Sequence, residues 1–212
     1  MFYIVTGHYG SGKTEVALNL AFNLKNPIII DLDIVNPFFR TKDAEEKLKE
    51  KGIRLIAPQY ANTNVDLPTL PPDIYGALQS DNDVIIDVGG DDDGAVALGQ
   101  YNRFFTEKPY EMIFVINTKR PSTSNADDII NMIHAVEQAS RLKVTSLINN
   151  TNIKGETTIE DVIDGQKIVN EVAYKTNLPI KAVTGKIDII NQIKTDVQKM
   201  PLDLHLLLPW EV

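Results

Sequence analysis

Cysteine is absent from the 212-residue sequence, which excludes disulfide bonds, cysteine-ligated zinc and cysteine-ligated iron–sulfur clusters. No apolar stretch approaches the ~20 residues needed to span a bilayer. The N-terminus has no basic segment ahead of an apolar one, as a secretory signal would. Internal repeats and low-complexity linkers are missing as well. We therefore expect a cytoplasmic protein without membrane contact, built as a single domain over residues 1–212.

Basic side chains are in deficit, with 21 Lys and Arg against 29 Asp and Glu, so the net charge is −8. Binding to nucleic acid or to anionic lipid depends on an excess of Lys and Arg, so neither is an expected partner. The hydrophobic fraction of 43% and the charged fraction of 24% are typical of a soluble globular protein.

Residues 7–14 follow a short apolar run and fit the pattern G-x-x-x-x-G-K-[ST], which predicts a phosphate-binding loop between a strand and a helix. In such loops backbone N–H groups surround phosphates, so we expect the whole stretch to bind nucleotide. Lys13 is expected to contact the β- and γ-phosphates as a catalytic group, and Thr14 to bind Mg²⁺. The complete set of loop residues is Gly7, His8, Tyr9, Gly10, Ser11, Gly12, Lys13 and Thr14.

Carboxylates stand where two apolar strands end. Asp31 and Asp33 close the run at 28–33 and would share one side of the strand if it stays extended that far. Asp87 closes the run at 83–87. Beside a phosphate loop, these acids are candidate Mg²⁺ ligands, and Asp33 is a candidate for orienting the attacking water. For Asp31 and Asp33 the alternative role is to solvate the strand end and cap the next element.

Two further groups of residues extend the candidate site. Gly89 and Gly90 follow Asp87 and leave the backbone bare, so an N–H there can meet a γ-phosphate. Asn149 and Asn150 directly follow another strand. Their amides can donate to and accept from the edge of an adenine, and they equally suit an ordinary turn.

Apolar strands alternate with helical patterns along the whole chain, including a helix expected near 187–200 and an edge strand in the Leu-rich tail. About seven strands are expected. This pattern predicts an α/β fold with a doubly wound, mainly parallel sheet and helices on both faces, of the P-loop NTPase type. Ligands should bind at the carboxyl ends of its strands.

The phosphate loop, Asp-Leu-Asp at 31–33 and Asp-Val-Gly-Gly at 87–90 together resemble the MinD/ParA/Mrp family of P-loop ATPases. The resemblance implies binding of ATP or ADP with Mg²⁺ and a nucleotide-dependent homodimer. It also implies that Asn149 or Asn150 faces the base. Guanine-specific GTPases carry Asn-Lys-x-Asp after a strand, and residues 149–152 lack that lysine, so ATP is preferred over GTP.

The chain departs from this family at His8, where the family has a signature lysine. A histidine with a pKa near 6.5 is mostly neutral at pH 7, so another cation must meet the charge of the transition state. Arg40 is the first candidate, as a catalytic residue, and Lys119 and Arg120 are the others. Each follows a strand on the expected ligand side.

Three functions fit these residues. The first is an ATP-hydrolysing switch that acts on an unidentified partner protein. The second is an enzyme that uses ATP to activate a carboxylate, as dethiobiotin synthetase does on a similar fold, with the loop at 58–72 as a substrate lid. The third is a nucleotide sensor with little turnover, which His8 favours.

Overall fold

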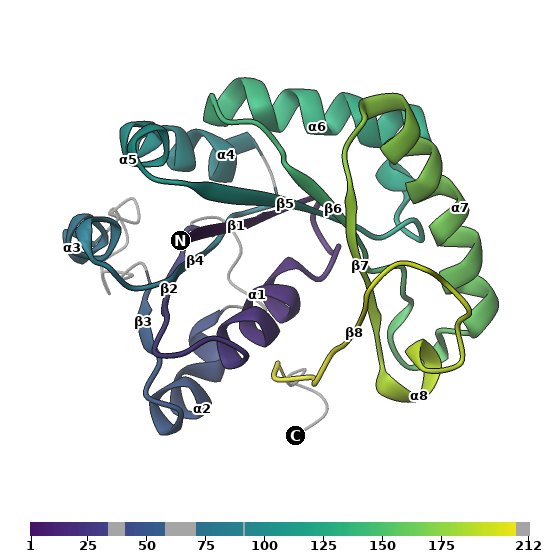
Figure 1. Cartoon of the computed structure of the whole chain (residues 1–212), viewed down its shortest axis with the longest axis horizontal. Coiled ribbons are helices and arrows are strands. Elements are labelled where there is room, and N and C mark those ends of the chain that lie inside the picture. The colour runs from purple at the N-terminus through teal and green to yellow at the C-terminus, as the bar shows by residue number, and fades with distance from the viewer. Residues whose placement is uncertain (34–40, 58–70, 91, 207–212) are drawn as a thin grey trace, which may run out of the picture.

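A computed structural model describes residues 1–33, 41–57, 71–90 and 92–206 (Figure 1). In these residues, eight strands form one sheet in the order β3-β2-β4-β1-β5-β6-β7-β8, and all neighbouring strands are parallel. The strands are β1 (Phe2–Thr6), β2 (Ile28–Asp31), β3 (Arg54–Ile56), β4 (Val84–Asp87), β5 (Tyr110–Ile116), β6 (Ser146–Asn149), β7 (Ile180–Gly185) and β8 (Lys199–Pro201). The predicted doubly wound parallel sheet is confirmed, with one strand more than expected.

Helices cover both faces of this sheet (Figure 1). Side chains alternate between the faces of a strand, and a parallel sheet buries both of them. Thus Ile4 of β1 belongs to the hydrophobic cluster under one set of helices, whereas Val5 belongs to the other. The first set comprises α3 (Asp73–Gln79), α4 (Asp92–Gly99), α5 (Asn102–Glu107), α6 (Ala126–Ser140) and α7 (Ile159–Thr176); the second comprises α1 (Lys13–Phe22) and α2 (Glu45–Glu50).

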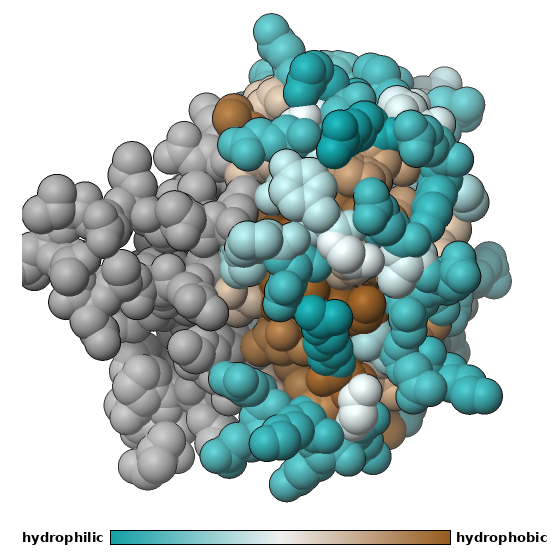
Figure 2. All heavy atoms as spheres, turned by 90° about the vertical axis from the view of Figure 1, so that its left-hand side faces the viewer, coloured by the Kyte–Doolittle hydropathy of each residue, from teal (hydrophilic) through white to brown (hydrophobic). Residues whose placement is uncertain are grey.

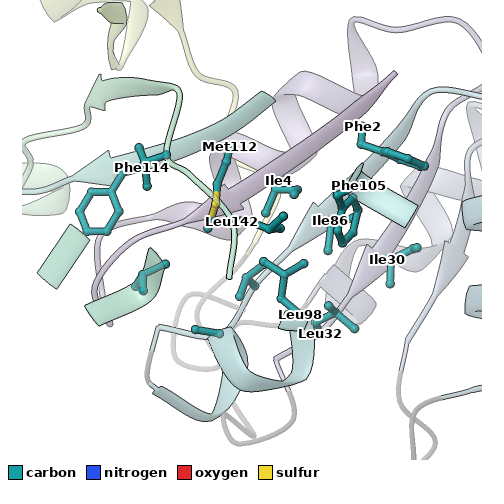
Figure 3. Packing of buried hydrophobic residues seen from close by; sticks show 14 of the residues in the cluster. Phe2, Ile4, Ile30, Leu32, Ile86, Leu98, Phe105, Met112, Phe114 and Leu142 are labelled. Atoms are coloured by element: carbon teal, nitrogen blue, oxygen red, sulfur yellow. The ribbon is translucent and has the colours of Figure 1, made fainter. Parts of the chain in front are cut away.

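The larger cluster packs the central strands against α4 and α5 (Figure 3). Phe2 of β1 meets Phe105 of α5 edge to face, with 5.3 Å between the ring centres. Ile4 and Leu98 are completely buried in the same cluster. Because a buried Leu, Ile or Phe contributes about 1.5–3 kcal/mol, this core holds β1 and β4 rigidly beneath the loops that follow them.

The segment after β7 differs from its prediction. The helix expected near 187–200 ends early, because α8 covers only Ile187–Ile190. The chain then returns as β8 beside β7, with Val183 N donating to Gln198 O at 2.9 Å. Pairing with the open edge of β7 therefore outweighs the helical pattern in the sequence. The edge strand exists, but it precedes the leucine-rich tail.

The segment after β8 is fastened to α1, the helix that follows the phosphate loop. Glu15 accepts hydrogen bonds from the backbone N–H groups of His205 and Leu206. Asn19 both donates to Asp203 O and accepts from Asp203 N, each at 2.9 Å. These contacts hold α1 against residues nearly two hundred positions away in sequence.

Aromatic rings join α3 to α5 on the side of the molecule shown in Figure 2. Tyr75 of α3 is 46% exposed and packs edge to face on the buried Tyr101 and on Phe104. The guanidinium of Arg103 lies over the Phe104 ring at 4.9 Å. The coloured part of this view is largely hydrophilic at its rim, with hydrophobic residues near the centre. Of the helices described, none has the length and apolar character to cross a membrane.

Candidate functional site

The phosphate loop lies between β1 and α1 at the carboxyl edge of the sheet. Gly10 and Gly12 have φ angles of 73° and 85°, a left-handed conformation that L side chains rarely adopt. A side chain on Gly12 would also collide with the Asn150 amide. The loop leads directly into the N-terminus of α1, and helix N-termini favour anions.

Lys13 and Gly90 bring the loops after β1 and β4 into contact. The Lys13 side chain is 7% exposed, and its Nζ donates to His8 O at 3.4 Å. A Cβ atom placed on Gly90 would lie 2.8 Å from Lys13 Nζ and 2.6 Å from Tyr9 N. Gly89 in turn lies against Gly94 of α4, where an added Cβ would come within 2.7 Å of Gly89 Cα. Gly90 therefore has no room for a side chain, and Gly89 leaves none for a side chain at position 94.

Asp31 and Asp87 end two neighbouring strands in register with each other. Both are buried, at 2% and 1% exposure. Asp33 lies beyond the end of β2 and is half-buried, and its N–H donates to Asp31 Oδ1 at 2.9 Å. The strand ends at Asp31, so the condition under which Asp31 and Asp33 would share one side of an extended strand is not met. All three acids still lie at the carboxyl edge of β2 and β4.

The Asp87 side chain is buried, and one of its two carboxylate oxygens has no hydrogen-bond partner among the described residues. Thr41 Oγ1 donates to Asp87 Oδ2 at 3.2 Å, whereas the buried Oδ1 has no hydrogen-bond partner among the described residues. Burial raises the pKa of Asp87 to about 6; the Asp33 charge also raises it, and Lys13, the Thr14 hydroxyl and Thr41 lower it. A buried carboxylate oxygen without a partner, beside the Thr14 hydroxyl, fits Mg²⁺, which uses one or two carboxylates and takes its other ligands from water and phosphate.

No group of three His, Cys, Asp or Glu side chains that could hold a metal by themselves occurs in the described part of the chain. A site that borrows its remaining ligands from phosphate and water does not need such a group. The donors present therefore suit a cation that arrives together with a nucleotide.

The raised pKa of Asp87 predicts a pH-dependent stability of the nucleotide-free protein. An unfolded aspartate has a pKa near 3.9. The pKa of Asp87 in the folded protein is higher than this. Protonated Asp87 therefore adds its full contribution to the free energy of unfolding below about pH 4, and this contribution is lost as the pH rises through about 6. Between pH 4 and pH 7, the free energy of unfolding of wild type should fall by up to about 3 kcal/mol relative to that of Asp87→Asn. Urea unfolding of both proteins in chelator measures this difference, and a difference that is constant with pH would contradict it.

His8 and Tyr9 lie on the outer side of the loop. His8 Nδ1 donates to Tyr9 O at 2.8 Å, and the Tyr9 side chain is 57% exposed. Of the three cations considered as substitutes for the missing lysine, Arg40 lies outside the described residues, as does most of the proposed lid at 58–72. Lys119 pairs with Asp161 at 2.5 Å, at the start of α7. Only Arg120 is seen at the loop, where Nε donates to Gly10 O at 3.0 Å.

The two asparagines after β6 have different surroundings. Asn149 is fully buried and donates to Gln166 Oε1 of α7 at 2.9 Å, so its amide serves packing inside the protein. Asn150 donates to Ser11 O at 2.7 Å and accepts from Thr184 Oγ1 at 2.8 Å. Asn150 thus supports the phosphate loop from behind, a role that differs from the predicted contact with a base.

Sequence reasoning missed Asn117, which follows β5 and is completely buried. Its amide donates to Asn152 O at 2.9 Å and to Gly10 O at 3.5 Å, so it joins the loops after β5 and β6 to the phosphate loop. The signal was a polar residue at the end of a long apolar strand. Asn117, Arg120 and Asn150 hold the carbonyl groups of Gly10 and Ser11.

No protein-family model and no curated protein sequence matches this chain. Solved structures do match. FtsY, a cell division protein from Thermotoga maritima, has a TM-score of 0.58 and 19% identity over 87% of this chain and 61% of its own. The signal recognition particle receptor FtsY from Elizabethkingia anophelis, in complex with GDP, has a TM-score of 0.54 and 18% identity over 86% of this chain and 56% of its own.

A third match is the signal recognition particle 54 kDa protein from Aeropyrum pernix K1, in complex with GDP, with a TM-score of 0.54 and 18% identity. It covers 86% of this chain and 40% of its own, so the chain spans less than two thirds of the length of all three proteins. At these identities the comparison shows the fold alone, a parallel sheet with helices on both faces. The narrower MinD/ParA/Mrp resemblance stays a prediction.

Proposed function

We propose that this protein binds a nucleoside triphosphate with Mg²⁺ and hydrolyses it as a switch that acts on a partner protein. The observation that supports this most is the convergence of Lys13, Asp87 and Gly90 at the phosphate loop. Lys13 and Gly90 are in contact, and the buried Asp87 keeps one oxygen without a partner among the described residues. Buried acceptors without a partner are rare in packed protein interiors, so this oxygen is a candidate ligand atom.

Each residue then has a defined task. The N–H groups of residues 7–14 bind the phosphate oxygens, and Lys13 donates to the β- and γ-phosphates. Thr14 and Asp87 would hold Mg²⁺, which neutralises the charge of the phosphates when bound. Asp31 and Asp33 are the remaining acids at this edge, and one of them positions the attacking water.

The same geometry supplies the switch. The backbone N–H of Gly90 can donate to a γ-phosphate, and Gly89 packs on Gly94 of α4. Loss of the γ-phosphate would therefore release the start of α4. A second copy of the chain or another partner protein that contacts the start of α4 would then bind differently before and after hydrolysis.

The base is the least constrained part of the proposal. We favour ATP because residues 149–152 lack the lysine of the guanine motif, although two of the similar structures hold GDP. Calorimetric titration with ADP and GDP in parallel, with and without Mg²⁺, tests this preference. We expect at least tenfold tighter binding of ADP in Mg²⁺. Tighter GDP binding would reverse the assignment, and absence of binding to both would remove the proposed function.

Hydrolysis is measured separately, as phosphate release at increasing protein concentration. Specific activity that rises with protein concentration is expected for a dimer-dependent switch. A constant activity would contradict the dimer, and nucleotide binding without phosphate release would favour a sensor.

A further inference from the structure

Arg120 is the only cationic side chain besides Lys13 that is seen to hydrogen-bond to the phosphate loop in the described part of the chain. It is half-buried and stands four residues after the end of β5, the strand beside β1. Its Nε donates to Gly10 O at 3.0 Å. The two Nη groups of its guanidinium have no hydrogen-bond partner among the described residues, so they retain donors for a ligand.

Gly10 provides the space for this guanidinium. A Cβ atom on Gly10 would lie 3.1 Å from Arg120 Nε and 3.3 Å from Cζ, closer than ordinary packing allows. The φ of 73° disfavours any other residue there as well. Gly10 thus both lets the loop turn and leaves room for the Arg120 guanidinium beside it.

The neighbouring basic side chains do not take the place of Arg120 beside the loop. Lys119, the adjacent residue, is paired with Asp161 at the start of α7. His8 lies at the position where related loops carry a lysine, and its Nδ1 donates to a backbone carbonyl. The protein as a whole has a net charge of −8, so a polyphosphate needs local positive charge to bind.

We propose that Arg120 is a phosphate-binding residue of this site, which holds Gly10 O through Nε and donates to the phosphate chain of the nucleotide through its Nη groups. The inference rests on the proposed function, since it assumes that a nucleotide occupies the loop. Arginine suits this role because its planar guanidinium offers several donors in fixed directions. It would place a permanent positive charge beside the loop in the same subunit.

The test compares Arg120→Lys, Arg120→Gln and Arg120→Ala by calorimetry with Mg-ADP and with a non-hydrolysable Mg-ATP analogue. Because a charged hydrogen bond is lost, the Gln and Ala variants should bind about ten- to a hundredfold more weakly. The Lys variant keeps the charge and should stay within about threefold of wild type. Raising the salt concentration should weaken binding less in the Gln variant than in wild type, because one charge pair is missing.

Lys119→Ala is the matched control, because it removes the adjacent positive charge and should leave affinity unchanged. Thermal melting of every variant shows whether the fold persists. Wild-type affinity in Arg120→Gln would overturn the proposal, since the residue would then act only as a neutral support for Gly10 O. An equal loss in Lys119→Ala would overturn it too. Failure of the proposed function looks different, because wild type itself would bind neither nucleotide.

Discussion

Lys13→Ala is expected to abolish measurable nucleotide binding, with a loss of affinity of at least about a hundredfold. The lysine is 7% exposed at the base of the phosphate loop, where its charge acts with little screening by water. Its ammonium contacts the loop through His8 O and adjoins Gly90, so it lies at the meeting point of both loops. Calorimetric titration with Mg-ADP and a non-hydrolysable Mg-ATP analogue measures the effect.

The control is Lys25→Ala, which removes an exposed lysine just after the same helix. It should bind as wild type does, which shows that net charge alone does not set affinity. The Lys13 variant should still fold, and its Asp87 pKa should rise further because an attractive charge is gone. Unchanged affinity in Lys13→Ala would remove the phosphate-loop assignment.

Gly90→Ala is expected to lower nucleotide turnover by about a hundredfold. The added methyl group would lie 2.6 Å from Tyr9 N, and backbone cannot move aside as a flexible side chain can. The loop after β4 must therefore separate from the phosphate loop, which removes the N–H proposed to meet the γ-phosphate. Stability should fall by no more than about 1–3 kcal/mol, the usual cost of overpacking. Phosphate release and urea unfolding give the two quantities.

Gly76→Ala makes the same chemical change in α3, where an added Cβ meets nothing within 4 Å. It should leave turnover unchanged and stabilise the protein by up to about 1 kcal/mol, because alanine is the better helix former. Wild-type turnover in Gly90→Ala would show that the loop after β4 does not serve the phosphates.

Local patterns in the sequence predicted most of the strands and the longer helices. The apolar run before Gly7 and the loop pattern that follows it identified β1 and α1. Patterns failed where a distant partner decided the conformation. A helix was expected as far as residue 200, yet Lys199–Pro201 pair with the edge of β7. Asp33 follows an apolar run, yet β2 ends at Asp31.

The candidate site divides in the same way. Asp31 and Asp87 could be placed together because strand ends of a parallel sheet meet at one edge. The roles of Asn117 and Asn150 could not be foreseen, since their amides bond to carbonyl groups of residues more than a hundred positions away. Nothing in the sequence separates Lys119 from Arg120 either. In the structure, Lys119 forms an ion pair with Asp161 at the start of α7, whereas Arg120 packs against Gly10 of the loop.

By itself, the sequence determined that a glycine-rich loop joins β1 to α1, and it predicted that this loop binds phosphate, because glycine, lysine and threonine occur at the spacing of phosphate-binding loops. It also determined the class of the sheet, because hydrophobic periodicity is a local property. The tertiary structure decided which side chains face that loop. Close contacts such as those of Gly90 with Tyr9, or of Arg120 with Gly10, arise only when strands distant in the chain come to lie side by side.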